Sequence, residues 1–252
     1  MLSVAAGPLH GRPVVLHNAQ EPHEAASTMK VAVLAALHRS GLDLDAEVPV
    51  VNRFESAVGG SFANDPGYDS DPEPWQRIGQ GRAPLRWLAE RMITHSSNLA
   101  TNLCLAQVGG AAVAGAWRAA GATHSASPRG IEDARARAAG VRNEVTALDL
   151  LRLVRSLEPE PLGLLERNTW RVDLAAGLPP GTRIAFKNGW FTGVRHSVGL
   201  VRPPDTAPYL LAVCYTGPLA SGDAEGDPAA ALLARLSARA WARRHELAGG
   251  RP

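Results

Sequence analysis

Short apolar stretches bounded by turn residues lie at both ends of the chain and predict β-strands. Two of them, residues 2–6 and 13–17, are separated by the Gly- and Pro-containing segment 7–11, which predicts a hairpin. Three more follow a Gly/Pro-rich turn after Ala176, and they cover residues 182–188, 195–201 and 209–215. The pattern therefore predicts strands at the two ends of the chain and a different structure between them.

Apolar residues three or four positions apart predict helices in the middle of the chain and at its C-terminus. In residues 25–38, Met29, Val33 and Leu37 share one helical face, and Gly41 ends the helix. Further helices are predicted at residues 84–93, 99–108, 111–120, 146–157 and 228–247. Residues 58–74 are rich in Gly, Asp and Pro, so we expect a surface loop whose acidic side chains are solvated.

Composition restricts the class of protein. The 252 residues are 45% hydrophobic and 20% charged, as in a soluble globular protein. The net charge of +2 indicates no nucleic-acid partner, and no apolar run approaches the length of a membrane span. Cys104 and Cys214 lie far apart without metal-site spacing, so we expect two buried apolar residues. The histidines show no zinc spacing, and we expect neither a metal nor a cofactor.

The distribution of basic residues points to particular positions. Of the 26 basic residues only Lys30 and Lys187 are lysine. A guanidinium stays protonated, whereas an ammonium that is removed from water can lose its proton and act as a base. Each lysine also lies in a short motif, which favours a chemical role over chance placement on the surface.

The first motif is Ser27-Thr28-Met29-Lys30. Residues three apart on a helix share a face, so the Lys30 amine can take the proton that makes the Ser27 hydroxyl a nucleophile. A helix start also leaves backbone N–H groups free to stabilise an oxyanion. On its own the pattern is weak, because Ser-x-x-Lys occurs by chance on many helices.

Two further motifs add polar groups. Ser96-Ser97-Asn98 lies between two predicted helices. There the Ser96 hydroxyl can shuttle a proton, and the Asn98 amide can hold a substrate amide. Ser97 or Asn98 can also cap the next helix. Lys187-Asn188-Gly189 ends a predicted strand, which delivers the lysine to a cleft edge. Gly189 would let a substrate lie against the backbone, and Trp190 would contribute an oxyanion N–H.

The three motifs resemble, in order and spacing, those of the penicillin-recognising serine enzymes, and within them the class A β-lactamases. Residues 27–30 are similar to the family's Ser-x-x-Lys, residues 96–98 to its Ser-Asp-Asn, and residues 187–189 to its Lys-Thr-Gly. The sequence of residues 92–103 also resembles that of the family around its second motif. The resemblance extends from the first hairpin to the last helix.

The resemblance implies an α/β fold of the class A β-lactamase type. It would have a five-stranded antiparallel sheet with flanking helices, built from residues 1–24 and 177–252, and a mostly helical lobe from residues 25–176. The strands of residues 1–20 and 182–216 would share one sheet, with the C-terminal helix packed on it. All 252 residues would form one domain of this type.

The resemblance also implies the roles of the motif residues. Ser27 would form an acyl-enzyme with Lys30 as its general base, and Ser96, polarised by Lys187, would protonate the leaving group. The backbone N–H groups of Ser27 and Trp190 would form the oxyanion hole. Substrate would be bound by the remaining motif residues, Asn98, Asn188 and Gly189, together with Trp190.

The sequence departs from the family at several of these positions. Ser97 replaces Asp, Asn188 replaces Thr, and Trp190 is bulky for a position beside the substrate. The Glu-Pro-x-Leu-Asn segment that supplies the water-activating carboxylate is missing as such. Glu132, with Asp133 as the neighbouring alternative, is the nearest substitute, although both also suit the start of a short helix as solvent-facing charges.

The predicted function is that of a β-lactamase-like serine hydrolase that cleaves an amide bond through an acyl-enzyme on Ser27. The alternatives are a related acyl-transfer enzyme (a D,D-peptidase, esterase, amidase or biosynthetic transacylase) and a non-catalytic ligand-binding relative. We expect a monomer that acts on a small or peptide-like amide or ester. Residues 1–7 show no signal peptide, so the expected location is cytoplasmic unless the true start lies upstream.

Overall fold

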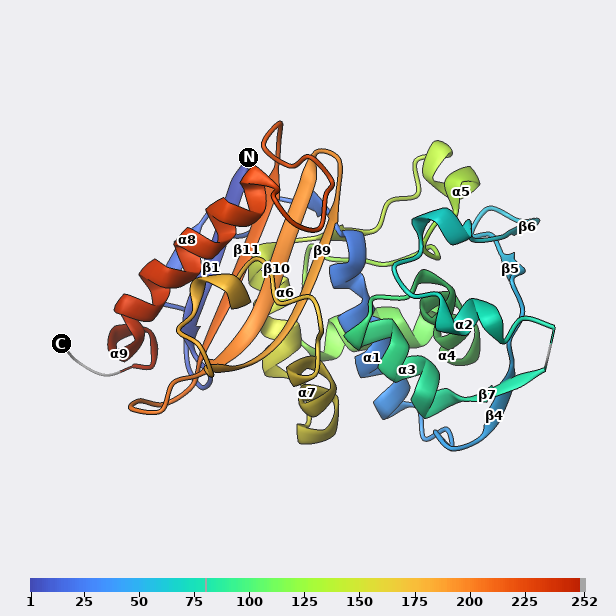
Figure 1. Cartoon of the computed structure of the whole chain (residues 1–252), viewed down its shortest axis with the longest axis horizontal. Helices are drawn as coiled ribbons and strands as arrows, with labels where there is room; N and C mark the ends of the chain where they lie inside the picture. The colour runs from blue at the N-terminus through green and yellow to red at the C-terminus, as the bar shows by residue number, and fades with distance from the viewer. Residues whose placement is uncertain (80, 250–252) are drawn as a thin grey trace.

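In the computed structural model, which describes residues 1–79 and 81–249, a five-stranded antiparallel sheet joins the two ends of the chain (Figure 1). The strand order is β2–β1–β11–β10–β9, so β1 lies between its hairpin partner and a strand from the C-terminal part. The strands are β1 (Leu2–Pro8), β2 (Val15–His17), β9 (Arg183–Phe191), β10 (Val194–Arg202) and β11 (Tyr209–Thr216). The prediction of one shared sheet is confirmed.

Alternate residues of each strand enter different cores. On β11, Leu210 and Ala212 belong to the large core shared with the helical lobe, whereas Leu211 and Val213 belong to a smaller core beneath α8. This is the period of two that a strand imposes on its side chains. The sheet is therefore buried on both faces, and the residues of its central strands are buried at nearly every position.

Helices cover both faces of the sheet, as Figure 1 shows. On one face α6 (Ala147–Arg155) packs against β1, β10 and β11, and the helical lobe continues from it through α1 (Lys30–Arg39), α3 (Leu85–Thr94) and α4 (Asn98–Ala119). On the other face lie α8 (Pro228–Ala242) and η3 (Ala175–Gly177). A Cβ on Gly177 would stand 2.0 Å from the Ala234 carbonyl oxygen, so this close contact requires glycine.

The predicted helices exist, but four of them differ in detail. The helix expected from residue 25 opens with a 3₁₀ turn, η1 (Ala26–Met29), before α1 begins. The helices predicted at 99–108 and 111–120 are the two halves of α4, which is bent where Gly109 leaves helical geometry (φ 76°, ψ 154°). The C-terminal helix is likewise divided at Arg243 into α8 and α9 (Arg244–Leu247).

Several elements of two to eight residues were not predicted, because most of these are too short to show a period. The helices among them are η2 (Pro66–Tyr68), α2 (Glu73–Gln76), α5 (Ala134–Ala138) and α7 (Pro159–Glu166). The strands form three pairs, β3 (His23–Glu24) with β8 (Glu144–Val145), β4 (Glu47–Pro49) with β7 (Arg82–Pro84), and β5 (Phe54–Glu55) with β6 (Ser61–Phe62).

The prediction that the acidic residues of segment 58–74 are solvated is wrong for two of them. Asp71 is fully buried, and its carboxylate accepts bonds of 2.5 and 2.6 Å from the Arg91 guanidinium. Asp69 accepts hydrogen bonds from the beginning of α4. Burial of a carboxylate requires such partners, and they lie 20 or more residues away in the sequence.

Two predictions about apolar residues can be compared with the fold. Cys104 and Cys214 are both buried free thiols, as expected. The expectation that no segment has the length of a membrane span is wrong for α4, which is long and apolar enough by length and composition alone. Its residues from Leu99 to Cys104 are buried in the large core against α1 and α3.

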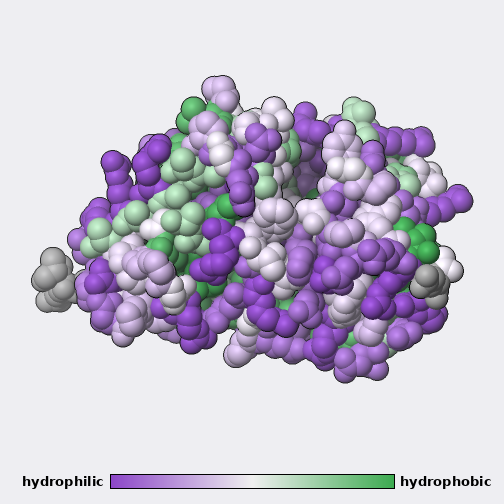
Figure 2. All heavy atoms as spheres, in the orientation of Figure 1, coloured by the Kyte–Doolittle hydropathy of each residue, from purple (hydrophilic) through white to green (hydrophobic). Residues whose placement is uncertain are grey.

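The face of the molecule seen in Figure 2 is largely polar. Figure 2 shows one face, where hydrophobic residues gather mainly over the sheet lobe and hydrophilic residues cover most of the helical lobe. The charged residues there are mostly arginine and acidic residues, since the chain has only two lysines.

A pair of buried histidines links the sheet to the segment before Ser27. The rings of His23 and His196 lie edge to face with centroids 5.2 Å apart. His196 accepts a hydrogen bond at Nδ1 from the Tyr215 N–H (3.1 Å), which leaves Nε2 to donate to the Glu24 carbonyl (2.9 Å). Burial lowers the pKa of His196 to about 4, and burial with the charge of His196 lowers the pKa of His23 to about 3.

This pair predicts a loss of stability in mild acid. Because both folded pKa values lie below the unfolded value of about 6.5, the unfolded chain binds protons that the folded chain excludes. Stability is therefore full above about pH 6.5 and falls as the pH drops towards 4, by about 1–2 kcal/mol per histidine between pH 7 and pH 5. Urea unfolding at the two pH values measures it.

The matched variants are His23→Asn and the exposed His10→Asn. His23→Asn should lose part of the difference between pH 7 and pH 5, whereas His10→Asn should keep all of it. The same pH dependence in the wild type and His23→Asn would contradict this interpretation.

Candidate active site

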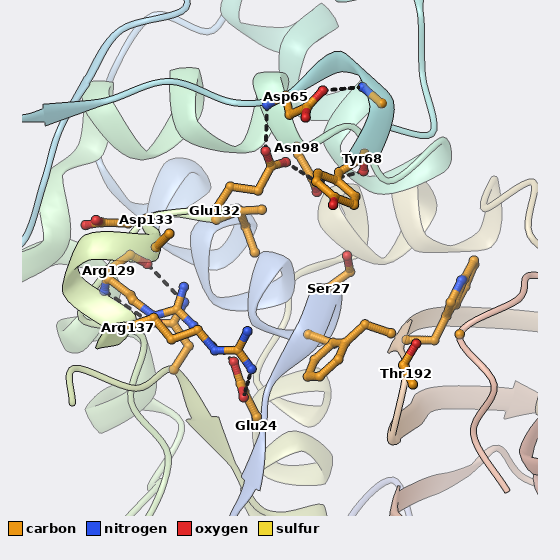
Figure 3. Close-up of a pocket in the computed structure, with 18 of the residues that line it drawn as sticks. Glu24, Ser27, Asp65, Tyr68, Asn98, Arg129, Glu132, Asp133, Arg137 and Thr192 are labelled. Carbon is orange, nitrogen blue, oxygen red and sulfur yellow. Dashed lines mark hydrogen bonds and ion pairs between the residues drawn. The ribbon is translucent and has the colours of Figure 1, made fainter. Parts of the chain in front are cut away.

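A cavity of about 860 Å³ lies where the helical lobe meets the edge strand β9 (Figure 3). Its lining comes from β3 and the η1 turn, the loop before α2, the beginning of α4, the loop that carries α5, the end of β9, and residues 221–223. Of the predicted site residues, Ser27, Asn98, Glu132 and Trp190 line this cleft. Lys30, Ser96 and Lys187 are buried.

The turn that carries Ser27 is held on several sides. Ala26, directly before it, has φ of 46°, a conformation that a non-glycine residue adopts only when its surroundings impose it. The Ala25 N–H donates to the Asn143 carbonyl (2.9 Å), and the Thr28 hydroxyl donates to the Ala25 carbonyl (2.5 Å). Ser27 thus lies inside the η1 turn, just before α1, with a fixed backbone.

Lys30, the first residue of α1, is fully buried among oxygen acceptors. Its Nζ donates to the Ser96 carbonyl (2.6 Å), the Ser96 hydroxyl (3.2 Å) and Asn98 Oδ1 (2.8 Å). Burial lowers the pKa of Lys30 to about 7, against the opposing effect of the Asp69 and Glu132 carboxylates. Within the described ranges no hydrogen bond joins Lys30 to Ser27, so the structure does not show the expected direct contact of these two side chains.

Lys187 approaches the same serine from the sheet. Its Nζ lies 3.0 Å from the Ser96 hydroxyl and 2.9 Å from the Asn188 carbonyl oxygen. Burial, followed by the charge of Lys30, lowers the pKa of Lys187 well below its ordinary value. The two amines therefore contact the same hydroxyl. The Ser96 backbone has positive φ (61°), and its carbonyl also accepts a hydrogen bond from Lys30.

The position where Ser97 replaces the family's Asp is supported by another carboxylate. Ser97 caps α4 by accepting from the Ala100 N–H (3.1 Å), and its hydroxyl donates to Asp69 Oδ2 (3.1 Å). The same oxygen of Asp69 accepts from the Leu99 N–H (2.8 Å). Asp69 belongs to the loop after η2, so a carboxylate from outside the motif binds the motif's turn.

Glu132 points into the cleft towards Asn98. Its Oε1 accepts from Asn98 Nδ2 and its Oε2 from the Asp65 N–H, both at 2.7 Å (Figure 3). Asn98 in turn accepts from Lys30 through Oδ1, so one amide connects the amine and the carboxylate. Glu132 also has positive φ (67°), a conformation that a non-glycine residue adopts only when its surroundings impose it.

Asp133, the alternative to Glu132, and Asn143 further along the chain both have structural contacts. Asp133 is fully buried and caps α5, and its carboxylate accepts from the Ser56 hydroxyl, the Ala57 N–H and the Ala136 N–H. The idea that Asp133 activates water is therefore wrong. Asn143 binds the backbone of Arg129 through both amide atoms (3.1 and 3.0 Å) and closes the neck of the loop.

The prediction that the Asn188 side chain lines the cleft is wrong. On β9 the alternation that turns Lys187 towards Ser96 turns Asn188 to the opposite face of the sheet, where it is buried and donates to Asp173 (3.1 Å). Gly189 faces Ser27 instead: a Cβ there would stand 2.5 Å from the Ser27 nitrogen. Because Gly189 has no side chain, the η1 turn can pack closely against it. The expectation that this space is for substrate is therefore wrong.

Trp190 forms part of the cleft wall and is fixed from behind. Its ring lies edge to face with Trp170 at 5.5 Å, and the guanidinium of Arg195 stacks on it at 4.7 Å. Arg195 is fully buried and is paired with Asp173 (2.6 Å) and Asp227 (3.2 Å). The Arg195 guanidinium thus lies behind the Trp190 ring, and its charge is compensated by the two carboxylates.

Several lining residues were missed by the sequence analysis. Tyr68 lines the cleft and is 76% exposed, and Phe191 continues the wall beyond Trp190. Glu24 and Arg137 form an ion pair at the opposite end. None of them belongs to a motif, and only the fold brings them together; an aromatic residue in a Gly/Asp/Pro-rich loop was the one local signal, at Tyr68.

The arrangement combines a partly buried hydroxyl, two amines with lowered pKa values, and a carboxylate. Such a set can deprotonate a nucleophile, protonate a leaving group and activate water. Within the described part of the chain no group of three or more His, Cys, Asp or Glu side chains could hold a metal ion.

The two lysines allow a direct test of these pKa values. Lysine labelled with ¹³C at Cε should give two side-chain NMR signals, because the chain has only Lys30 and Lys187. The Lys30 signal should titrate near pH 7 and the Lys187 signal far below the ordinary lysine value of about 10.4. Lys187→Arg, which keeps a positive charge, assigns the remaining signal. A lysine that titrates near 10.4 would contradict the burial argument.

Comparison with known proteins agrees with this geometry. A family model described as the β-lactamase enzyme family matches residues 2–243. Among solved structures, PBP-A is 21% identical with a TM-score of 0.76, covering 96% of this chain and 90% of its own. A β-lactamase from Xanthomonas campestris pv. campestris is 21% identical (TM-score 0.77; 95% and 90% covered). A variant of the class A β-lactamase of the last common ancestor of Gram-negative bacteria is 26% identical (TM-score 0.76; 97% and 94% covered).

A search of curated proteins found no match. The family model covers nearly the whole chain, and the structural matches confirm the predicted fold class. The chain belongs to the β-lactamase enzyme family, and its family and fold are those of a serine hydrolase of the class A β-lactamase type.

Proposed function

We propose that this protein opens the amide bond of β-lactams through an acyl-enzyme on Ser27. The observation that carries the proposal is the Ser96 hydroxyl between two buried amines, 3.2 Å from Lys30 Nζ and 3.0 Å from Lys187 Nζ. Such a hydroxyl can return to the leaving nitrogen the proton that the nucleophile loses.

In the proposed acylation, Lys30 in its neutral form removes the proton of Ser27 Oγ, which attacks the lactam carbonyl. A pKa of about 7 supports this role, since an appreciable fraction of Lys30 is then neutral at neutral pH. The backbone N–H groups of Ser27 and Trp190 receive the developing oxyanion, a role supported by the close contact of Gly189 with the Ser27 nitrogen. Asn98 binds the substrate amide.

In the proposed deacylation, Glu132 activates the hydrolytic water. Its hydrogen bond to Asn98 (2.7 Å) supports this role, because the same amide contacts Lys30 and so relates the carboxylate to the acylation machinery. The carboxylate belongs to the cleft lining and is not needed to cap α5, since Asp133 does that.

Intact mass spectrometry after incubation with penicillin G and with an activated ester tests the proposal. Penicillin G is a suitable probe because a structurally similar protein, the L158E variant of PBP-A, forms an acyl-enzyme with it. We expect a penicilloyl adduct on the wild type and none on Ser27→Ala. Ser221→Ala, another serine of the cleft lining, should keep the adduct.

Each other outcome has a distinct meaning. An adduct with the ester alone would replace β-lactam hydrolysis by the related acyl-transfer activity. Failure of both probes to acylate the wild type would contradict an acyl-enzyme mechanism.

The role of Glu132 in hydrolysis of the acyl-enzyme can be tested separately. Glu132→Gln should acylate normally and deacylate about 10²-fold more slowly or worse, since a general base contributes on that scale. The acyl-enzyme should then accumulate in a time course of intact mass, while the exposed Glu55→Gln behaves as the wild type. An unchanged deacylation rate in Glu132→Gln would assign water activation to another group.

A further inference from the structure

Glu24 joins two parts of the site that are far apart in the sequence. It lies three residues before Ser27, on the short strand β3, and its side chain is 18% exposed. Its Oε1 accepts from Arg129 (3.1 Å) and its Oε2 from Arg137 (2.8 Å), as Figure 3 shows. One carboxylate thus binds two arginines of the loop that carries Glu132.

The two arginines flank Glu132 on either side in the sequence. Arg129 is 7% exposed, and its guanidinium also donates to the carbonyls of Val141 (3.0 Å) and Gly130 (3.2 Å). Its position inside the protein requires a counter-ion, because an unpaired buried cation is strongly destabilising. Arg137, on α5, is half exposed and lies against the ring of Phe191 at 5.6 Å.

The backbone of Glu24 is held from the other direction. Its carbonyl accepts from His196 Nε2 on the central strand β10 (2.9 Å), and its strand pairs with β8, Glu24 opposite Glu144. The position of this residue is therefore set by the sheet. Its side chain transmits that position to the loop.

We propose that Glu24 is a positioning residue: its carboxylate clamps residues 129–137 against the strand that leads to Ser27 and so sets where Glu132 stands relative to the nucleophile. The inference rests on the proposed function for its kinetic consequence. Removing the clamp should slow deacylation, which needs Glu132. It should affect acylation little, because the hydrogen bonds of Lys30, Ser96 and Lys187 do not involve the Glu24 carboxylate.

The kinetic test compares Glu24→Gln, Arg137→Gln and the double variant with Glu21→Gln, an exposed glutamate on the same segment. With penicillin G and intact mass, Glu24→Gln should deacylate about tenfold more slowly, while its acylation rate stays within about twofold of wild type, since small displacements of a catalytic group cost rate. The double variant Glu24→Gln/Arg137→Gln should deacylate no more slowly than Glu24→Gln, because Glu24 and Arg137 act through the ion pair between them. Glu21→Gln should match the wild type.

Amide hydrogen exchange supplies a readout that needs no turnover. In Glu24→Gln the amides of residues 129–141 should exchange faster than in the wild type, and those of α3 should not change. If no probe acylates the wild type, the proposed function fails, and this exchange result still decides the clamp. Unchanged exchange in residues 129–141, or equal slowing of acylation and deacylation, would overturn the inference.

Discussion

The buried contact of two lysine amines with the hydroxyl of Ser96 is the constraint around which the rest of the site is built. Lys30 reaches it from the helical lobe and Lys187 from the sheet, so the contact also holds the two lobes together. Two charged ammonium groups that contact the same buried hydroxyl repel each other and have lost their hydration. The cleft is consequently a place where at least one amine is driven to give up its proton, and the chemistry follows from that.

Unusual backbone geometry marks the same region. Among the described residues, the non-glycine positions with positive φ include Ala26, Ser96 and Glu132, which belong to the three segments that meet at the cleft. Each turn re-aims a functional group: the Ser27 backbone, the Ser96 carbonyl and the Glu132 carboxylate. Such conformations persist only where surrounding contacts impose them. Asp69, Asn143 and the packing of Gly189 against η1 supply part of those contacts.

The parts of the fold with a strong local period could be predicted from the sequence. The five strands and the major helices were found, because alternation and helical spacing are properties of neighbouring residues. The motif residues Ser27, Lys30, Ser96 and Lys187 were also found, and the structure brings the last three into direct contact. The bend of α4 at Gly109 and the short elements escaped, because they depend on packing or are too short for a period.

The errors within the site have a common cause. Asn188 was assigned to the cleft as part of a motif, although a strand that turns Lys187 one way must turn its neighbour the other way. Asp133 was kept as an alternative to Glu132, although only the fold shows that Ser56 and Ala57 occupy its carboxylate. Asp69 and Glu24 act on residues distant in the sequence, and no local pattern announces such partners.

The burial of both lysines has a practical consequence for handling this protein. Lys30 and Lys187 are fully enclosed, so the positive charge of the surface is carried by arginine. Reagents that couple to lysine amines, among them common dyes, crosslinkers and activated resins, find no side-chain target on the folded surface. Because the two amines have no exposed surface in the folded protein, their modification would report on opening of the buried site and not on surface exposure.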